Sequence, residues 1–274
     1  MLRRDEKPIV KTSEQIEKIR KSCQLVSAAI AEVGRHIRPG VSTLYLDKIA
    51  ETFIRDHGGI PIFKGYTFDK DTPPFPGSIC ASINEVVVHG IPSAKTILKE
   101  GDIISIDCGV VLDGYVGDSA YTFGVGEISA EKEKLLRVTK EALNRAIAQV
   151  KVGNRLGDLG YAVQSYVESF GFSVVRDMVG HGVGIRLHEP PDVPNYGKKG
   201  HGKKFQANWV LAIEPMVNVG GYKIEIAEDK WTVITADRKP SAQFEHTVAI
   251  FEDRTEILTT FAEIEQLTNV TIYG

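Results

Sequence analysis

Residues 104–123 read ISIDCGVVLDGYVGDSAYTF, and this stretch decides how the first half of the chain folds. Two apolar runs flank the dipeptide Asp113-Gly114, which is typical of the two-residue turn of a β-hairpin. With this pair as the loop, Asp107 lies opposite Ala120 on the facing strand. Asp118 is then a diagonal neighbour of Asp107 on the same face, about 7–8 Å away at Cα. The spacing therefore predicts a hairpin that presents two carboxylates together.

Two carboxylates on one buried face need a compensating charge, because unpaired charges are costly to remove from water. A divalent metal ion bound by Asp107 and Asp118 would supply that charge. The alternative is a hairpin at the edge of a sheet, with both aspartates facing solvent. The hairpin alone does not distinguish the two interpretations.

The composition is that of a globular protein with no bulk attraction to nucleic acid. The 274 residues are 42% hydrophobic and carry a formal net charge of −3, so there is apolar material for a large core and no electrostatic drive toward nucleic acid. The three cysteines show no metal-type spacing and are an odd number, which favours a reducing compartment. No signal-peptide core and no run of about 20 apolar residues is present. We expect a cytoplasmic protein.

Apolar spacing predicts two pairs of amphipathic helices that repeat after 113 residues. This offset relates Gly40 to Gly153 and Gly58 to Gly171, and the apolar positions between the glycines also align. The alternative to a duplication is chance, since any two amphipathic helices that end in glycine can be aligned. Strand-rich segments follow each helix pair. The pattern predicts an α+β fold in which two helix pairs cover a curved antiparallel sheet.

No low-complexity segment or linker divides the chain. We therefore expect a single domain at residues 13–274, with halves at about 13–125 and 129–252. Residues 1–12 are expected to form a charged, peripheral N-terminal extension.

Two further segments bear on the site. Residues 60–78 are rich in proline, glycine and aromatic residues and are predicted to form a long loop, and such loops are often functional. Residues 79–88 are predicted to form one strand. A later loop contributes lysines that are expected to form a solvated surface, namely Lys198, Lys199, Lys203 and Lys204.

The second half of the chain places one histidine and two glutamates in tight local contexts. His181 lies between glycines, Glu214 ends an apolar strand, and Glu245 opens the last strand. Singly, such residues are more often ordinary than functional. With Asp107 and Asp118 they make four carboxylates and one imidazole, which a packed sheet could not hold without compensating cations. This set suits Mn²⁺, Fe²⁺, Co²⁺ or Zn²⁺ in a two-metal arrangement.

Other histidines have plainer contexts. His36, His57 and His201 lie at polar or helix-end positions and are expected at the surface. His246, on the last strand, is either a core residue or a residue that supports the site.

Five segments occur in an order and spacing typical of one known family: SICASINEVVVHGIP (78–92), IDCGVVLDGYVGDSAYTF (106–123), GHGVGIRLHEPP (180–191), AIEPM (212–216) and AQFEHTVAI (242–250). They resemble the motifs of type I methionine aminopeptidases, and the resemblance runs from about residue 13 to residue 250. It implies the pita-bread fold, an α+β domain with pseudo-two-fold symmetry. That symmetry would explain the 113-residue repeat.

The resemblance also implies a function, namely metal-dependent removal of the N-terminal methionine from nascent proteins and from peptides with a small second residue. The cofactors would be two divalent ions of Co, Mn, Fe or Zn. The implied partner is the N-terminus of a peptide or nascent chain, met in transient proximity to the ribosome. No specific nucleic acid or membrane partner is implied, and we expect a monomer, since nothing in the sequence demands a dimer.

Matched by motif position, the metal ligands would be Asp107, Asp118, His181, Glu214 and Glu245. Asp107 would bind one metal through both oxygens, Asp118 and Glu245 would bridge the two metals, and Glu214 would also transfer protons.

Two more histidines match family residues that contact substrate without binding metal. His188 would polarise the scissile carbonyl, and His89 would hydrogen-bond the peptide near the scissile nitrogen. With Glu214 they form the expected catalytic set. The residues expected to line the methionine pocket, besides these histidines, are Cys80, Trp231, Phe75 and Tyr66.

The sequence departs from the family pattern next to this pocket. Gly65-Tyr66 and Phe75-Pro76 are separated by residues 67–74, which resemble an insertion. Leu187 also stands where the family commonly has an aromatic residue. Both differences bear on the shape of the pocket.

Two other functions compete with this interpretation. A proline-directed dipeptidase or aminopeptidase could share the fold, but such relatives usually carry an additional N-terminal domain of about 100 residues or more, for which one domain's worth of chain leaves no room. A non-catalytic binding protein could also share the fold, but such relatives typically lose metal ligands, whereas all five are present here.

Overall fold

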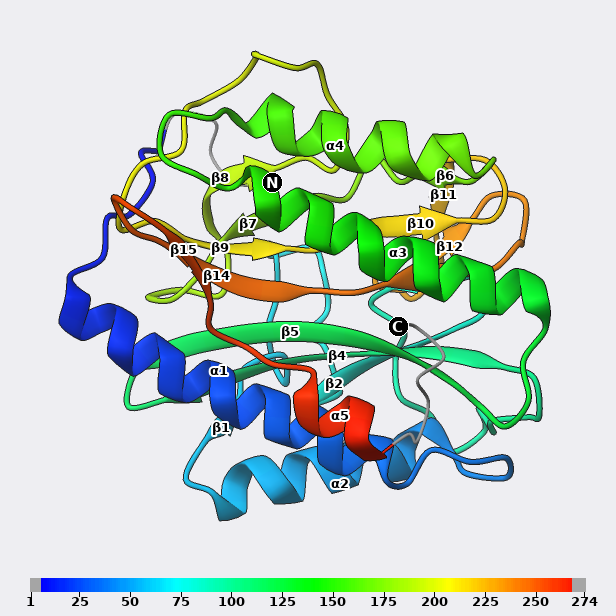
Figure 1. Cartoon of the computed structure of the whole chain (residues 1–274). Coiled ribbons are helices and arrows are strands. Elements are labelled where there is room, and N and C mark those ends of the chain that lie inside the picture. The colour runs from blue at the N-terminus through cyan, green and yellow to red at the C-terminus, as the bar shows by residue number, and fades with distance from the viewer. Residues whose placement is uncertain (1–5, 268–274) are drawn as a thin grey trace.

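The computed structural model describes residues 6–267, and Figure 1 shows its strands between two pairs of helices. The lower pair in this view is α1 (Ser13–Gly34) and α2 (Thr43–Asp56), and the upper pair is α3 (Ala130–Gln149) and α4 (Leu156–Ser169). A short helix, α5 (Ala262–Leu267), packs against α1. The outer parts of the expected extension and domain, residues 1–5 and 268–274, lie outside the described residues.

The two halves repeat in the backbone at the predicted offset. Helices α2 and α4 begin at residues 43 and 156 and end at residues 56 and 169. Each is followed by a glycine with positive φ, Gly58 at 76° and Gly171 at 81°, a conformation that glycine adopts without steric cost. The short strands β1 (Ile60–Pro61) and β6 (Ser173–Val174) follow at the same spacing. The predicted pseudo-two-fold repeat is therefore confirmed.

The predicted hairpin is formed by β4 (Ile103–Leu112) and β5 (Tyr115–Gly124), with Asp107 opposite Ala120 as expected. Asp113 and Gly114 both have positive φ, which is the backbone of a type I′ turn. Strand β4 also pairs with β1 and with β2 (Ile79–Ile83). Helix α1 packs on the hairpin. The hairpin is therefore interior, and the solvent-facing alternative is wrong.

The remaining strands of the described chain form three further antiparallel sheets. A five-stranded sheet runs in the order β15-β14-β9-β7-β8. Its members are β7 (Gly180–Gly182), β8 (Glu189–Val193), β9 (Val210–Ile213), β14 (His246–Ile250) and β15 (Thr255–Ile257). Two three-stranded sheets have the orders β13-β10-β6 and β11-β12-β3. Their remaining members are β3 (Val86–Val88), β10 (Met216–Asn218), β11 (Ile224–Ile226), β12 (Val233–Thr235) and β13 (Ser241–Gln243).

The halves meet where β5 runs beside the segment that joins β13 to β14. The backbone N–H of Glu245 donates to the carbonyl oxygen of Ala120 at 2.9 Å. Thr247 Oγ1 donates to the carbonyl oxygen of Asp118 at 2.7 Å, and Ser119 Oγ donates to that of Glu245 at 2.7 Å. These bonds fix Glu245 beside the aspartates of the hairpin, although more than 120 residues separate them in sequence.

Two local expectations are corrected. Residues 79–88 form two strands rather than one, because Asn84 adopts a φ of 50° and turns the chain between β2 and β3. The N-terminal segment is not wholly peripheral, since Lys11 is buried against Glu189. In addition, β1 lies at the start of the expected 60–78 loop.

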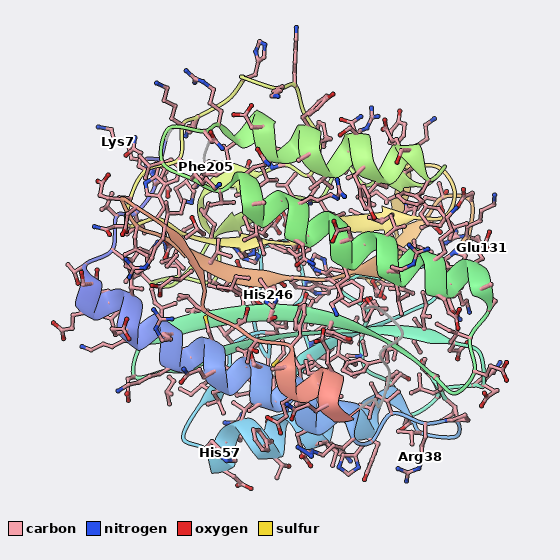
Figure 2. The ribbon with its side chains drawn as sticks, in the orientation of Figure 1. Lys7, Arg38, His57, Glu131, Phe205 and His246 are labelled. Atoms are coloured by element: carbon pink, nitrogen blue, oxygen red, sulfur yellow. The ribbon has the colours of Figure 1, made fainter. Side chains whose placement is uncertain are left out.

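Figure 2 shows His246 inside the molecule, whereas Lys7, Arg38 and His57 lie at its outline. The His246 ring stacks on Phe261 with 3.9 Å between centroids. Its Nδ1 makes a 2.7 Å hydrogen bond with Thr259 Oγ1. Burial lowers the pKa of His246 to about 3, so the ring is neutral. Of the two alternatives, the structure places His246 in the core. Within residues 6–267, no helix has the length and apolar character needed to span a bilayer.

Candidate metal centre

The two aspartates of the hairpin point into the protein and lack ordinary partners. Asp118 is 3% exposed. The Oδ1 atoms of Asp107 and Asp118 are both buried, and neither has a hydrogen-bond partner within the described chain. A buried acceptor of this kind is costly unless something absent from the polypeptide satisfies it.

His181 brings an imidazole nitrogen to these carboxylates. It lies on β7, where the register pairs it with Ala212 of β9. Its Nδ1 lies 3.0 Å from the carbonyl oxygen of Gly182, so Nδ1 carries the proton and Nε2 keeps a free lone pair. Nε2 lies 3.5 Å from Glu214 Oε1 and 3.8 Å from Asp118 Oδ2. Burial lowers the pKa of His181 and keeps the ring neutral, as a metal ligand must be.

The two glutamates approach from neighbouring segments. Glu214 directly follows β9, and its Oε2 accepts a 3.2 Å hydrogen bond from Gln243 Nε2. Asn195 Nδ2 donates to the backbone carbonyl of Glu214 at 3.0 Å and so fixes the chain there. Glu245 is 2% exposed, and its Oε1 has no partner among residues 6–267.

These five side chains form one charged cluster. Three of them bring potential ligand atoms within 4.8 Å of one another: a carboxylate oxygen of Asp118, a ring nitrogen of His181 and a carboxylate oxygen of Glu245. Burial raises the pKa of Asp107 to about 7. Burial first, and repulsion from neighbouring carboxylates second, raises the pKa values of Asp118, Glu214 and Glu245 well above the usual range. In the described chain, no lysine or arginine forms an ion pair with any of the five. Two buried carboxylates (Asp118 and Glu245), two half-buried ones (Asp107 and Glu214), three orphaned oxygens and one free imidazole nitrogen fit divalent transition-metal ions.

A second group of histidines borders the cluster. The rings of His181 and His188 lie 4.4 Å apart, and His188 Nδ1 lies 2.6 Å from the hydroxyl of Tyr66. Burial lowers the pKa of His188 well below its usual value. His89 has a φ of 58°, an uncommon backbone for a non-glycine residue and one that clusters at functional sites. Burial also lowers the pKa of His89, to about 4.

The residues predicted for the methionine pocket lie together. Phe75, Cys80 and Trp231 belong to one buried apolar cluster, and Tyr66 packs against it. The Phe75 and Trp231 rings lie 5.2 Å apart. Cys80 pairs with Asp107 in the β2–β4 register, so the apolar cluster directly borders the charged one. The structure thus places the candidate metal ligands, the two candidate substrate histidines and the four expected pocket residues next to one another.

Sequence reasoning missed two residues that contact this group and one that contacts a neighbour of His188. Phe68, in the 67–74 segment, has its ring 5.5 Å from His188 and 5.8 Å from His89. Gln243 donates a hydrogen bond to Glu214. The sequence could have indicated this residue, because Gln243 lies two positions before Glu245 and residues with this spacing share one face of a strand. Lys11 pairs with Glu189, the neighbour of His188, and a lone lysine in a charged terminal segment gives no sequence signal.

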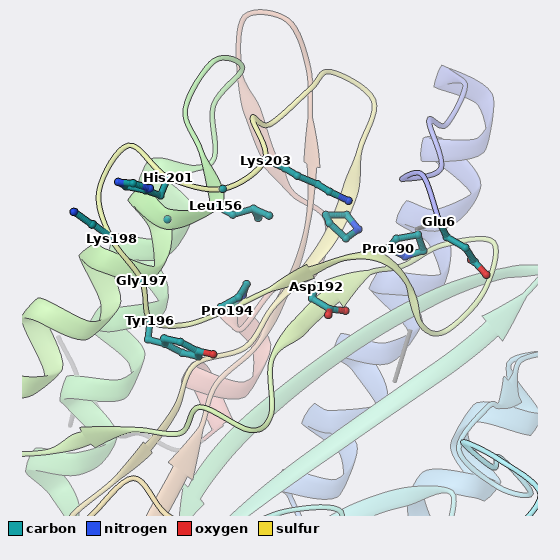
Figure 3. Close-up of a pocket in the computed structure, with 13 residues that line it drawn as sticks. Glu6, Leu156, Pro190, Asp192, Pro194, Tyr196, Gly197, Lys198, His201 and Lys203 are labelled. Atoms are coloured by element: carbon teal, nitrogen blue, oxygen red, sulfur yellow. The ribbon is translucent and has the colours of Figure 1, made fainter. Parts of the chain in front are cut away.

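A cavity of about 390 Å³ lies elsewhere, between the start of α4 and the loop after β8. Figure 3 shows Lys198 and His201 on one rim and Pro190 and Glu6 on the other. None of the five clustered side chains lines it. Lys198, Lys199, Lys203 and Lys204 are exposed, as expected.

Comparison with known proteins gives one consistent result. Residues 17–252 match metallopeptidase family M24. The methionine aminopeptidase of Clostridium acetobutylicum is 49% identical over 251 residues, which is 92% of this chain and 98% of that protein. Methionine aminopeptidase 1 of Bacillus subtilis is also 49% identical, with the same coverage. The solved methionine aminopeptidase of Thermotoga maritima superposes with a TM-score of 0.89 at 42% identity, and the match covers 93% of this chain and 100% of that one.

Proposed function

The chain belongs to metallopeptidase family M24, and on this premise we propose that it is a methionine aminopeptidase that hydrolyses the bond after an N-terminal methionine when the second residue is small. The observation that carries the proposal is the buried cluster described above, with its three carboxylate oxygens that lack partners in the described chain. Divalent metal is the one component that such a cluster requires.

Five residues would hold the metal, and we propose two ions of Co²⁺, Mn²⁺, Fe²⁺ or Zn²⁺. The ligands would be Asp107, Asp118, His181, Glu214 and Glu245. When bound, such ions lower the pKa of a water molecule and polarise a carbonyl group. The chain itself must then orient the peptide and move the protons.

His188 would donate a hydrogen bond to the oxygen of the scissile carbonyl. Burial lowers the pKa of His188 and raises that of Tyr66, so the ring is neutral and the hydroxyl keeps its proton. The Tyr66 hydroxyl therefore donates to Nδ1, and the ring proton lies on Nε2. This tautomer gives His188 a donor for the oxygen that becomes negative in the transition state.

Glu214 would accept the proton of the attacking water and pass it to the leaving amine. Gln243 and Asn195 fix this glutamate from two sides. His89 would hydrogen-bond the peptide near the scissile nitrogen. The methionine side chain would lie in the apolar group of Cys80, Phe75, Trp231 and Tyr66.

We further propose that the enzyme acts in the cytoplasm, as a monomer, on nascent chains that emerge near the ribosome. The reducing compartment is supported by three buried cysteines, none of which forms a disulfide.

Metal-stripped protein, reconstituted with Co²⁺, Mn²⁺, Fe²⁺ or Zn²⁺ in turn, should be assayed with Met-Ala-Ser, Met-Lys-Ser and Ala-Pro-Ser. We expect release of methionine from Met-Ala-Ser, little from Met-Lys-Ser, and no cleavage of Ala-Pro-Ser. Cleavage of Ala-Pro-Ser would favour a proline-directed peptidase. Failure to bind or use any of these metals would favour a binding protein.

A further inference from the structure

The segment 67–74 is held in one conformation by its own hydrogen bonds. The Asp69 carboxylate accepts from the backbone N–H groups of Asp71 and Thr72 at 2.9 and 2.8 Å. It also accepts from the Thr72 hydroxyl at 2.9 Å. Thr67 Oγ1 donates to the carbonyl oxygen of Thr72 at 3.0 Å, which closes the loop from the other side. A loop with this many internal bonds presents its side chains in fixed positions.

The loop is also bonded to the second half of the chain. Trp231 Nε1 donates to the carbonyl oxygen of Pro73 at 2.7 Å. Lys230 Nζ donates to that of Asp71 at 2.9 Å. Trp231 is itself part of the apolar group proposed to receive methionine, so the loop and that pocket are one structural unit.

Phe68 is the side chain that this loop places over the site. Its ring lies 5.0 Å from that of Trp231, 5.4 Å from Tyr66, 5.5 Å from His188 and 5.8 Å from His89. Phe68 is 44% exposed, whereas Trp231 is only 4% exposed. Phe68 is therefore the outer member of the aromatic group and reaches both histidines at once.

We propose that Phe68 is a specificity-determining residue that limits the size of the second residue of the substrate. The inference rests on the proposed function, in which His188 and His89 contact the two sides of the scissile bond. A ring that spans both histidines lies where the chain leaves that bond toward solvent. The second residue must pass the ring, and a fixed aromatic wall leaves room for a small side chain but not for a branched one.

The test compares second residues of increasing size on metal-loaded enzyme. The kcat/KM values for Met-Ala-Ser, Met-Val-Ser and Met-Leu-Ser should be measured for the wild type, Phe68→Ala and Asp69→Ala. The first variant removes the wall, and the second releases the loop that holds it. The matched control is Tyr161→Ala, which removes an aromatic ring that is 48% exposed on α4, outside the site.

We expect the preference for alanine over valine to fall about tenfold in Phe68→Ala, the scale set by one or two methylene groups in a tight pocket. Asp69→Ala should shift the preference in the same direction, and Tyr161→Ala should leave it unchanged. Thermal unfolding identifies variants that do not fold, and Phe68→Leu replaces Phe68→Ala in that case. If the wild type cleaves Met-Ala-Ser but the folded loop variants keep its preference for alanine over valine, the proposed role of Phe68 is wrong and the proposed function stands. Wild-type enzyme inactive on Met-Ala-Ser would instead overturn the proposed function.

Discussion

The ammonium group of Lys11 forms an ion pair with the carboxylate of Glu189, and both side chains are buried. The second oxygen of Glu189 accepts hydrogen bonds from the backbone N–H groups of Ile185 and Arg186, at 2.7 and 2.8 Å. Glu189 thus closes the turn that presents His188. The N-terminal segment, which is distant in sequence from the site, neutralises the carboxylate that shapes this turn.

Lys11→Met should destabilise the protein by about 3–5 kcal/mol, because it leaves a buried carboxylate without its cation. Urea unfolding, followed by circular dichroism, measures this difference. The double variant Lys11→Met with Glu189→Gln should recover part of the loss, since it removes both charges. A single variant as stable as the wild type would show that the pair contributes little.

Tyr66→Phe should lower kcat about tenfold, because the hydroxyl that holds the proton of His188 on Nε2 is worth about 1–1.5 kcal/mol. His188→Ala should lower kcat further, by about 10²–10³-fold, as expected for loss of an oxyanion donor. The double variant should be no slower than His188→Ala, since Tyr66 acts through His188.

Tyr45→Phe is the matched control for Tyr66→Phe, because the Tyr45 hydroxyl also lies beside a histidine, 3.5 Å from His36 Nδ1, and neither residue belongs to the candidate metal centre. Its kcat should equal that of the wild type. Near-native turnover by His188→Ala would contradict the role given to that residue.

The half-buried, neutral His89 should make the free energy of unfolding depend on pH in the acid range. Burial lowers the folded-state pKa of His89 to about 4, against about 6.5 in the unfolded chain. As the pH drops, His89 is therefore protonated in the unfolded chain before it is protonated in the folded protein. The free energy of unfolding falls between pH 6.5 and pH 4, by about 3 kcal/mol at most.

Comparison with His89→Gln isolates this contribution, since other groups titrate in the same range. The free energy of unfolding of metal-stripped protein should fall less steeply from pH 6.5 to pH 4 in the variant. Parallel curves for the two proteins would show that His89 is not held neutral.

Metal binding should release protons at pH 7. Burial raises the pKa of Asp107 to about 7, and those of Asp118, Glu214 and Glu245 well above their usual range, so the metal-free cluster holds protons that the metal must displace. Titration calorimetry with Mn²⁺ in two buffers of different ionisation enthalpy measures the number released. The Glu245→Gln variant should release fewer protons than the wild type. A binding enthalpy that does not depend on the buffer would refute proton-linked metal binding.

The features that could be predicted from the sequence are those set by short-range rules. Asp113-Gly114 fixes the hairpin because few other dipeptides adopt that turn, and the turn then fixes which residue faces Asp107. The glycines that end α2 and α4 mark the repeat for a similar reason. The meeting of His181 and Glu245 with the hairpin followed from family resemblance and from the cost of burying four carboxylates unpaired.

The features that could not be predicted depend on distant partners or on loop conformation. The Lys11–Glu189 pair joins residues 178 positions apart, and no local pattern marks either member. Asn84 interrupts a segment whose apolar residues all favour a strand, because its side chain bonds to Asp102 and to the backbone of Ile103 instead. The position of Phe68 depends on bonds from Asp69 within its loop and from Lys230 and Trp231 outside it.

Metal content per chain, measured by mass spectrometry after saturation with Mn²⁺ and gel filtration, decides whether the five clustered side chains form a two-metal site. We predict two ions per chain in the wild type and loss of at least one in Asp107→Asn and in Glu245→Gln, with hydrolysis of Met-Ala-Ser falling alongside. Wild-type protein that retains no metal, or variants that retain as much metal as the wild type, would show that these side chains are not the metal ligands.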